Sequence, residues 1–165
     1  MVSISLVIVN YNTKEYLSRC VRSIYKSGIS IDSIQLIIVD NNSQDSSLEI
    51  TREFIDKKSL DVEIIYNSEN LGFSKSVNIG LKKCLGNYVC VLNPDTYIEK
   101  LCLNKLKDYM DQNLEIGVIT PKIINSNGSL QISCKRSLPT IKNSIFKILG
   151  LDKVFKGSKT ISAYN

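Results

Sequence analysis

Short runs of apolar residues recur along the chain, and each run stops at a polar turn. The runs at 3–9, 33–39 and 88–93 are largely uninterrupted by polar residues and too short for a typical helix, so they predict strands buried on both faces of a parallel sheet. A further strand is expected at 62–66. Between the runs, apolar residues at helical spacing predict helices over about 14–27, 46–58, 74–84 and 100–112. This alternation predicts an α/β fold, with a mostly parallel sheet flanked by helices.

Two of the expected helices carry start signals. Asn12 precedes Glu15 and Ser46 precedes Glu49 by three residues, which is the spacing of a capping box. In that motif the first side chain accepts a hydrogen bond from a free N–H of the first helical turn. We therefore expect Asn12 and Ser46 to cap their helices.

The C-terminal third has a different pattern. Residues 117–120 predict another strand, closed by Pro121, and Asn127-Gly128 predicts a two-residue turn in a hairpin over 123–132. Residues 140–149 form an amphipathic pattern that predicts a basic helix. No repeat or linker interrupts the chain, so a single domain over 1–165 is expected.

Composition narrows the possible chemistry. The 165 residues include five scattered cysteines, no CxxC pair and no histidine, which argues against a zinc site and excludes a histidine general base. Scattered cysteines in apolar runs suit buried thiols in a reducing cytosol. No apolar run approaches a membrane span, and the first residues lack the basic region of a signal peptide, so a cytoplasmic location is predicted.

Charge is unevenly distributed. Residues 1–99 carry 10 basic and 12 acidic side chains, whereas residues 100–165 carry 11 and 4. The basic C-terminal part, including the 140–149 helix, either contacts anionic lipid at a membrane surface or simply packs on the domain. It lacks interleaved aromatic residues, so nucleic acid is not an expected partner.

Polar side chains follow three of the expected strands: Asn10-Tyr11-Asn12, Asp40-Asn41-Asn42 and Asn93-Pro94-Asp95. The carboxyl ends of parallel strands meet at one edge, where open α/β sheets bind ligands. A tyrosine ring can stack on a base, one carboxylate can accept from a base or ribose, and a second can hold a divalent cation against a diphosphate. The same residues also suit ordinary turns and helix caps. GxGxxG and GxxxxGK[ST] motifs are absent, which disfavours a dinucleotide fold and a P-loop.

An ordered set of motifs resembles a known family. The set comprises Val7-Ile8-Val9-Asn10-Tyr11-Asn12, Val39-Asp40-Asn41-Asn42-Ser43, Asn70-Leu71-Gly72-Phe73, Asn78-Ile79-Gly80 and Leu92-Asn93-Pro94-Asp95-Thr96. It resembles the nucleotide-binding half of family 2 inverting glycosyltransferases, which have the Rossmann-like GT-A fold. Among them it is most similar to the bacterial rhamnosyltransferase-like members that decorate surface polysaccharides.

The resemblance implies a role for each matching residue. The nucleotide-binding portion would cover about 1–120, followed by the hairpin and basic helix at about 121–165. Tyr11 would line the base pocket beside Asn12, and Asp40 would bind a uracil or thymine ring. The residues implied on or near the loop at the base and ribose are Asn70, Gly72, Phe73, Lys75 and Asn78, the last of which would hold the loop.

The resemblance also implies a metal. Asn93-Pro94-Asp95 stands where the family has an Asp-x-Asp motif, so Asp95 and Asn93 would hold Mn²⁺ or Mg²⁺. With one carboxylate instead of two, the site would depend more strongly on the donor diphosphate.

The implied reaction is inverting transfer of a sugar from a UDP- or dTDP-sugar to a polysaccharide or lipid-linked acceptor. The family's catalytic base lies in a Glu-Asp segment after a Gly-Ala-rich stretch, and none of Glu99, Asp108, Asp111, Glu115 or Asp152 lies in such a segment. No base is assigned, and the chain is expected to be a fragment of such an enzyme. A non-catalytic nucleotide-binding or interaction remnant is the alternative.

Overall fold

The computed structural model describes residues 2–58 and 61–131 of the chain. Residues 1–119 and 120–165 form two compact units. The first unit contains a four-stranded sheet in the order β3-β2-β1-β4, in which every neighbouring pair is parallel. The predicted parallel α/β fold is confirmed.

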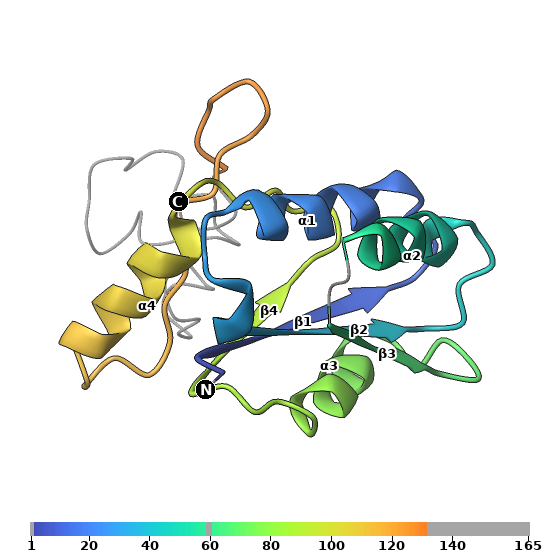
Figure 1. Cartoon of the computed structure of the whole chain (residues 1–165), viewed down its shortest axis with the longest axis horizontal. Helices are drawn as coiled ribbons and strands as arrows, with labels where there is room; N and C mark the ends of the chain where they lie inside the picture. The colour runs from blue at the N-terminus through green and yellow to red at the C-terminus, as the bar shows by residue number, and fades with distance from the viewer. Residues whose placement is uncertain (1, 59–60, 132–165) are drawn as a thin grey trace, which may run out of the picture. The chain divides into compact units, whose positions relative to one another are not determined.

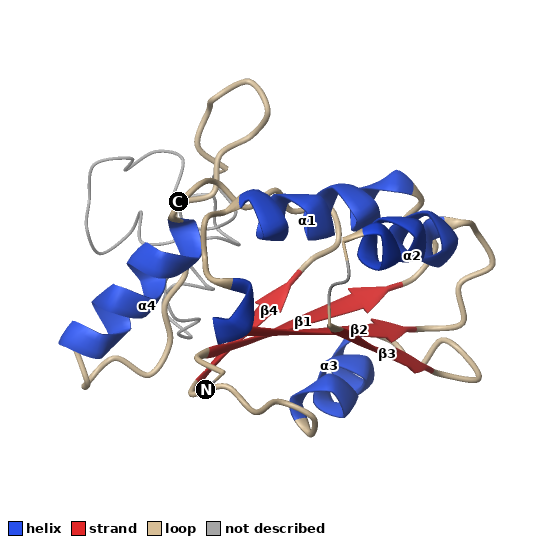
Figure 2. Cartoon of the chain, viewed as in Figure 1, coloured by secondary structure: helices blue, strands red, loops and turns tan. Residues whose placement is uncertain are grey.

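The strands and helices alternate along the chain. The strands are β1 (Ile4–Asn10), β2 (Ile34–Asp40), β3 (Val62–Tyr66) and β4 (Tyr88–Leu92). The helices are α1 (Glu15–Lys26), α2 (Ser47–Lys57), α3 (Phe73–Leu81) and α4 (Cys102–Gln112), with a short 3-10 turn η1 (Ile31–Ser33) before β2. Helices α1 and α2 cover one face of the sheet and α3 covers the other (Figures 1 and 2).

The core follows the two-residue period of the strands. Leu6, Ile8 and Ile38 belong to a large cluster that includes residues of α1 and α2, whereas Val7 and Val39 belong to a smaller cluster that includes Ile79 of α3. All seven residues of β1 are buried. The prediction that β1 is buried on both faces is therefore confirmed.

The same prediction is wrong for β4. Val89 and Val91 are each 45% exposed, although Leu92 on the opposite face is buried. Helix α3 packs on β1 and β2, and within the described part of the chain this face of β4 stays half exposed. Among the described residues, β4 is also an edge strand of the sheet, with β1 as its one neighbour.

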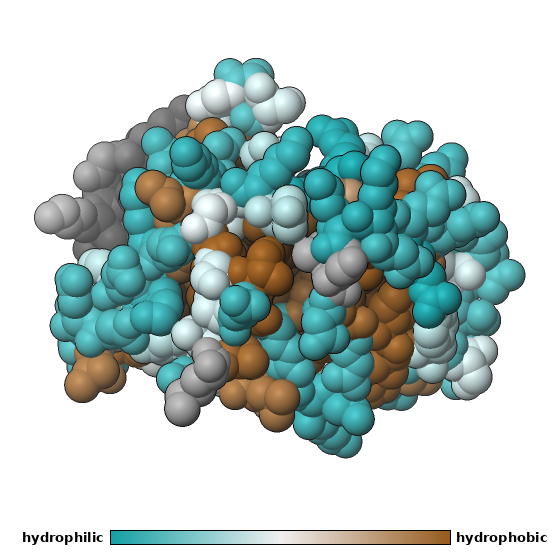
Figure 3. All heavy atoms as spheres, viewed as in Figure 1, coloured by the Kyte–Doolittle hydropathy of each residue, from teal (hydrophilic) through white to brown (hydrophobic). Residues whose placement is uncertain are grey.

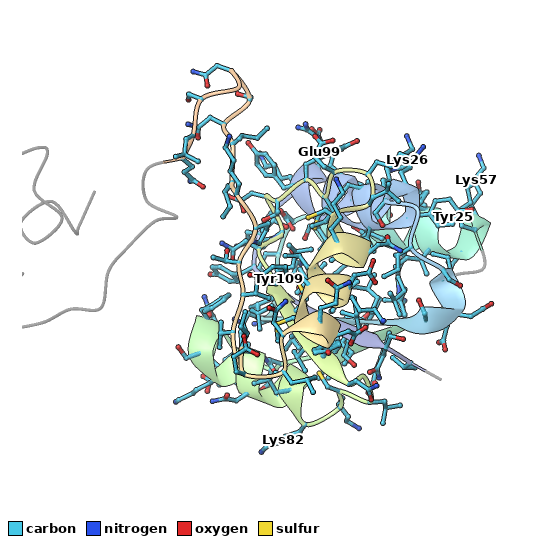
Figure 4. All side chains as sticks on the ribbon, turned by 90° about the vertical axis from the view of Figure 1, so that its left-hand side faces the viewer. Tyr25, Lys26, Lys57, Lys82, Glu99 and Tyr109 are labelled. Carbon is cyan, nitrogen blue, oxygen red and sulfur yellow. The ribbon has the colours of Figure 1, made fainter. Side chains whose placement is uncertain are left out.

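The helix ends face solvent. Lys26 and Lys57 lie in the last turns of α1 and α2, and Lys82 is the C-cap of α3. Positive charge is favourable there because the free carbonyl groups carry the negative end of the helix dipole. Figure 4 shows the three lysines pointing outward from the two faces, and Figure 3 shows apolar surface between the α1–α2 layer and α3.

Both predicted capping boxes are wrong. Helix α1 has Lys14 as its N-cap, and Ser46 at the start of α2 makes no side-chain capping bond. The side chains near these helix starts bond instead to residues about 30 positions away. Asp45 also accepts from the Ser47 N–H at 3.1 Å, so Asp45 and not Ser46 bonds to the first turn of α2.

The last described residues differ from the prediction in two ways. No strand forms at 117–120, where Val118 is 90% exposed, so that prediction is wrong. The hairpin forms as one antiparallel bridge between Ile124 and Leu130. Its loop has three residues rather than two, with Gly128 at φ 80°. The predicted helix at 140–149 lies outside the described residues.

Candidate nucleotide-sugar site

The strand register brings the polar turns to one edge of the sheet. Asn10 pairs with Asp40, and Asp40 pairs with Tyr66, so β1, β2 and β3 end in one row. Leu92 pairs with Ile8, two residues before the end of β1. The turn that begins at Asn93 therefore leaves the sheet at the same carboxyl edge, as the sequence predicted.

Asp40 is the most constrained of the predicted ligand-binding residues. It is 3% exposed, and its Oδ1 accepts hydrogen bonds from Asn10 Nδ2 at 2.7 Å and from Ser43 Oγ at 2.6 Å. Its Oδ2 accepts one hydrogen bond, from the Ser43 backbone N–H at 3.0 Å. Hydrogen bonds to a charged group contribute about 1.5–3 kcal/mol each, so they offset the cost of burying the carboxylate.

Asn10 supports this arrangement from β1. It is fully buried, and its Nδ2 also lies within hydrogen-bonding distance of Ser43 Oγ, at 3.0 Å, and Ser47 Oγ, at 2.9 Å. Its Oδ1 accepts from Thr13 Oγ1. Asn10 therefore fixes the Asp40 carboxylate relative to the start of α2.

Asn12 joins two loops instead of capping α1. Its Oδ1 accepts from the Gln44 N–H at 2.7 Å, and its own N–H donates to Ser43 Oγ at 3.1 Å. Asp45 completes the connection by accepting from the Lys14 N–H at 2.7 Å. Burial acts to raise the pKa of Asp45, but hydrogen bonds from Ser47 and Lys14 lower it overall. The loops after β1 and β2 are thus rigidly cross-linked.

Tyr11 lies directly after β1, above this network. Its side chain is 47% exposed and makes no hydrogen bond within the described residues. The ring is therefore accessible at the carboxyl edge, where a flat ligand could stack on it.

The loop after β3 carries the other predicted nucleotide-binding residues. Asn70 Oδ1 accepts from the Gly72 N–H at 2.9 Å, which turns the chain into α3. Gly72 adopts φ 78° and ψ 166°, a region that is open essentially to glycine alone. Phe73, Lys75 and Asn78 are exposed on α3.

Asn78 makes no hydrogen bond to this loop within the described residues. The loop is held instead by Asn67 and Ser76, both of which bond to Asn41. Sequence reasoning did not assign these three residues. Ser76 lies one helical turn before Gly80 on the buried face of α3, and that spacing was an available signal.

The predicted metal-binding turn follows β4. Asp95 and Asn93 are exposed, and the Asn93 carbonyl accepts from the Thr96 N–H at 3.1 Å and from Cys20 Sγ at 3.7 Å. Cys20 is fully buried against this turn, and its burial raises the pKa of the thiol to about 12, with Cys90 and Asp95 adding to the shift. One carboxylate and one amide oxygen suit Mg²⁺ or Mn²⁺, since Mg²⁺ commonly binds one or two carboxylates together with substrate phosphates. The described residues contain no cluster of three or more histidine, cysteine or acidic side chains.

The structure places Asp111 away from the candidate site. Its carboxylate accepts from Tyr88 Oη and Lys107 Nζ, each at 2.6 Å. Tyr88 begins β4, so Asp111 lies at the amino edge of the sheet, opposite the Asp95 turn. Asp152 lies outside the part of the chain that the structure describes.

These features define an open α/β protein with polar side chains gathered at the carboxyl edge of its strands, where open α/β sheets bind ligands. The chain belongs to glycosyl transferase family 2, whose family model matches residues 5–163. The family predicted from the motifs is therefore confirmed.

Several characterised proteins are similar to this chain. The poly(ribitol-phosphate) β-N-acetylglucosaminyltransferase TarS of Staphylococcus aureus is 26% identical over 160 residues, which cover 94% of this chain and 28% of TarS. The glycosyltransferase GlyA of Streptococcus pneumoniae serotype 4 is 35% identical over 117 residues, which cover 70% of this chain and 16% of GlyA. The chain thus spans less than a third of either relative.

Solved structures share the fold. The crystal structure of S. aureus TarS 1–349 in complex with UDP-GlcNAc matches with a TM-score of 0.69 and 23% identity, over 86% of this chain and 38% of that one. The mannosyltransferase PcManGT from Pyrobaculum calidifontis, in complex with GDP-Man and Mn²⁺, matches with a TM-score of 0.54 and 19% identity, over 57% of this chain and 28% of that one. The expected GT-A fold is confirmed by this likeness.

Proposed function

We propose that this chain is the donor-binding part of a glycosyltransferase that moves a sugar, with inversion, from a UDP- or dTDP-sugar to a polysaccharide or lipid-linked acceptor. The observation that carries the proposal is the meeting of Tyr11, Asp40 and the Asp95 turn at one sheet edge, in a chain of this family. Each supplies a different part of a nucleotide-diphosphate site: a stacking surface, a hydrogen-bond acceptor and a charge that can hold a cation.

The spacing of these groups supports the proposal. Asp40 ends β2 and Asp95 follows β4, with β1 between them, so two inter-strand spacings of about 4.8 Å each separate their strands. A base held at Asp40 would place its diphosphate toward Asp95. Asp40 Oδ2 accepts one hydrogen bond and Oδ1 accepts two, so Oδ2 is the oxygen with room to accept from a ring N–H of uracil or thymine.

Mn²⁺ or Mg²⁺ is the proposed cofactor, held by Asp95 and Asn93 together with the donor diphosphate. When bound, the cation would offset the charge that develops on the leaving diphosphate. The described residues contribute binding and orientation: Tyr11 and Asp40 would hold the base, while the Asn70–Lys75 segment would flank the ribose. The Mn²⁺ bound with GDP-Man in the PcManGT structure supports the choice of metal.

The names of the relatives support an acceptor at the bacterial cell surface. They include the poly(ribitol-phosphate) transferase TarS and a poly(ribitol-phosphate) β-glucosyltransferase of Bacillus spizizenii. These names specify N-acetylglucosamine and glucose, so the rhamnosyl resemblance stays a prediction. None of the described helices is long and apolar enough to cross a bilayer. We propose a cytoplasmic location, with peripheral membrane contact through the basic C-terminal part. A reducing compartment is supported by the free thiols of Cys20, Cys84, Cys90 and Cys102.

Isothermal titration with UDP and dTDP, each with and without Mn²⁺, tests the proposal. We expect metal-enhanced binding of at least one nucleotide, loss of that binding in Asp40→Ala, and loss of the metal enhancement in Asp95→Ala. Asp32→Ala is the matched control, because Asp32 is an exposed carboxylate at the opposite, amino end of β2. A folded wild-type chain that binds neither nucleotide at millimolar concentration would refute the proposal and favour a non-catalytic remnant.

A further inference from the structure

Asn41 is an amide that is buried beside the proposed base site and that no known role explains. It follows the last residue of β2 and is 2% exposed. Its Oδ1 accepts hydrogen bonds from Asn67 Nδ2, at 2.7 Å, and from Ser76 Oγ. Asn67 Nδ2 also approaches Ser76 Oγ at 3.2 Å, so the three side chains form a closed triangle. We call these residues the amide clamp.

The amide clamp joins three segments that are distant in sequence. Asn41 follows β2, Asn67 begins the loop after β3, and Ser76 lies in the first turns of α3. The backbone reinforces the connection, because the Asn67 N–H donates to the Asp40 carbonyl at 2.8 Å. The amide clamp therefore holds the loop 68–72 on both sides, through Asn67 before the loop and Ser76 after it.

The loop itself has few other restraints. Ser68, Glu69 and Asn70 are exposed, and Gly72 could accept a Cβ without meeting any atom within 4 Å. Its internal hydrogen bonds, from Gly72 N–H to Asn70 Oδ1 and from Ser76 N–H to the Gly72 carbonyl, fix its shape but not its place on the sheet. The contact with Asn41 supplies that placement.

Asp40 and Asn41 are consecutive, so their side chains point to opposite faces of the sheet. Asp40 bonds toward the α1–α2 face through Asn10 and Ser43, and Asn41 bonds toward α3 through Ser76. We propose that Asn41 is a positioning residue that sets the distance between Asp40 and the loop 68–72, and thereby the width of the slot that receives the nucleoside. This inference rests on the proposed function of the site.

If Asn41 only stabilised the fold, its variants would weaken nucleotide binding no more than other variants that destabilise the protein equally. Any variant that loses buried hydrogen bonds is destabilised, because the donors left behind are unpaired. The test therefore needs a control variant that loses buried hydrogen bonds elsewhere in the sheet. Ser5 provides it: Ser5 is fully buried near the amino end of β1, and its hydroxyl bonds to Gln35, Leu85 and Gly86.

The test compares Asn41→Leu, Asn41→Asp and Ser5→Ala by UDP titration and by urea unfolding. Leucine keeps the size of the side chain but cannot accept from Asn67 or Ser76, whereas a carboxylate accepts from both. We expect at least a tenfold weaker Kd for Asn41→Leu, a Kd within about threefold of wild type for Asn41→Asp, and an unchanged Kd for the destabilised Ser5→Ala. Ser76→Ala removes one bond of the clamp and serves if Asn41→Leu does not fold; we expect a Kd at least threefold weaker.

Amide hydrogen exchange of residues 67–76 gives a second readout that needs no nucleotide. We expect Asn41→Leu or Ser76→Ala to speed exchange in this segment, and Ser5→Ala to leave it unchanged. If the wild type binds neither UDP nor dTDP, the proposed function fails, and the exchange data alone decide whether Asn41 places the loop. Wild-type affinity in Asn41→Leu, or equal losses of affinity in Asn41→Leu and Ser5→Ala, would overturn the inference.

Discussion

Gly80 is the point at which α3 lies closest to the sheet. A Cβ added there would stand 2.5 Å from Val7 Cγ1 and 3.2 Å from Val39 Cγ2. Both valines are fully buried in the central strands β1 and β2. The Gly80→Ala variant therefore places a methyl group where the core has no space for one.

The cost follows from these distances. Carbon atoms normally pack at about 3.5–4.0 Å, so the new contact is about 1 Å too short. Overpacking of this kind costs about 1–3 kcal/mol. Alanine recovers about 1 kcal/mol through its better helix propensity. Because Val7 is β-branched and cannot easily rotate away, we take the upper end of the range and expect a net loss of about 2 kcal/mol in the free energy of unfolding.

Urea unfolding followed by circular dichroism measures this loss. Gly117→Ala is the control, because Gly117 is exposed and a Cβ there meets no atom within 4 Å. Val7→Ala removes the methyl group that the new Cβ strikes, so the double variant should be more stable than the sum of the single effects by at least about 1 kcal/mol. Wild-type stability of Gly80→Ala, or strict additivity with Val7→Ala, would show that α3 does not pack as described.

Two further predictions concern the turn at Gly72 and the thiols of Cys20 and Cys90. Gly72→Ala forces a residue with a side chain into a glycine-only conformation, which costs about 1–3 kcal/mol; we expect weaker UDP binding by titration, and an unchanged Kd would contradict the assigned backbone. Burial raises the pKa of Cys20 to about 12 and that of Cys90 to about 11. The buried Cys20 thiol should therefore react with iodoacetamide at pH 8 only as urea unfolds the protein, and the partly buried Cys90 thiol should react more slowly in the folded protein than in urea, as peptide mass spectrometry can measure. Rapid labelling of Cys20 without urea would contradict its burial.

Burial of a strand could be predicted where both of its neighbours belong to the sheet. The apolar runs of β1 and β2 indicated burial on both faces, and Leu6, Val7, Ile37 and Ile38 are fully buried. The run in β4 is equally apolar, yet Val91 is half exposed. The difference lies in what covers the strand, which the sequence of the strand itself does not encode.

The candidate site could likewise be predicted only in part from the sequence. The edge at which Asp40 and Asp95 meet was predictable, because the direction of parallel strands fixes where their ends lie. The bonds of Asn12 to Gln44 and of Asn41 to Ser76 were not, because each joins residues more than 30 positions apart. Local rules assigned Asn12 to a helix cap, and tertiary contacts overrode that assignment.

The uncovered face of β4 has a consequence for handling the protein. Within the described residues, the outer backbone groups of β4 have no partner strand, and Val89 and Val91 flank them. An open edge beside exposed apolar side chains is a template for the addition of another strand, whether from a second molecule or from an unfolded chain. Self-association should accordingly begin at β4 and increase with protein concentration, on the same strand that leads into the Asp95 turn.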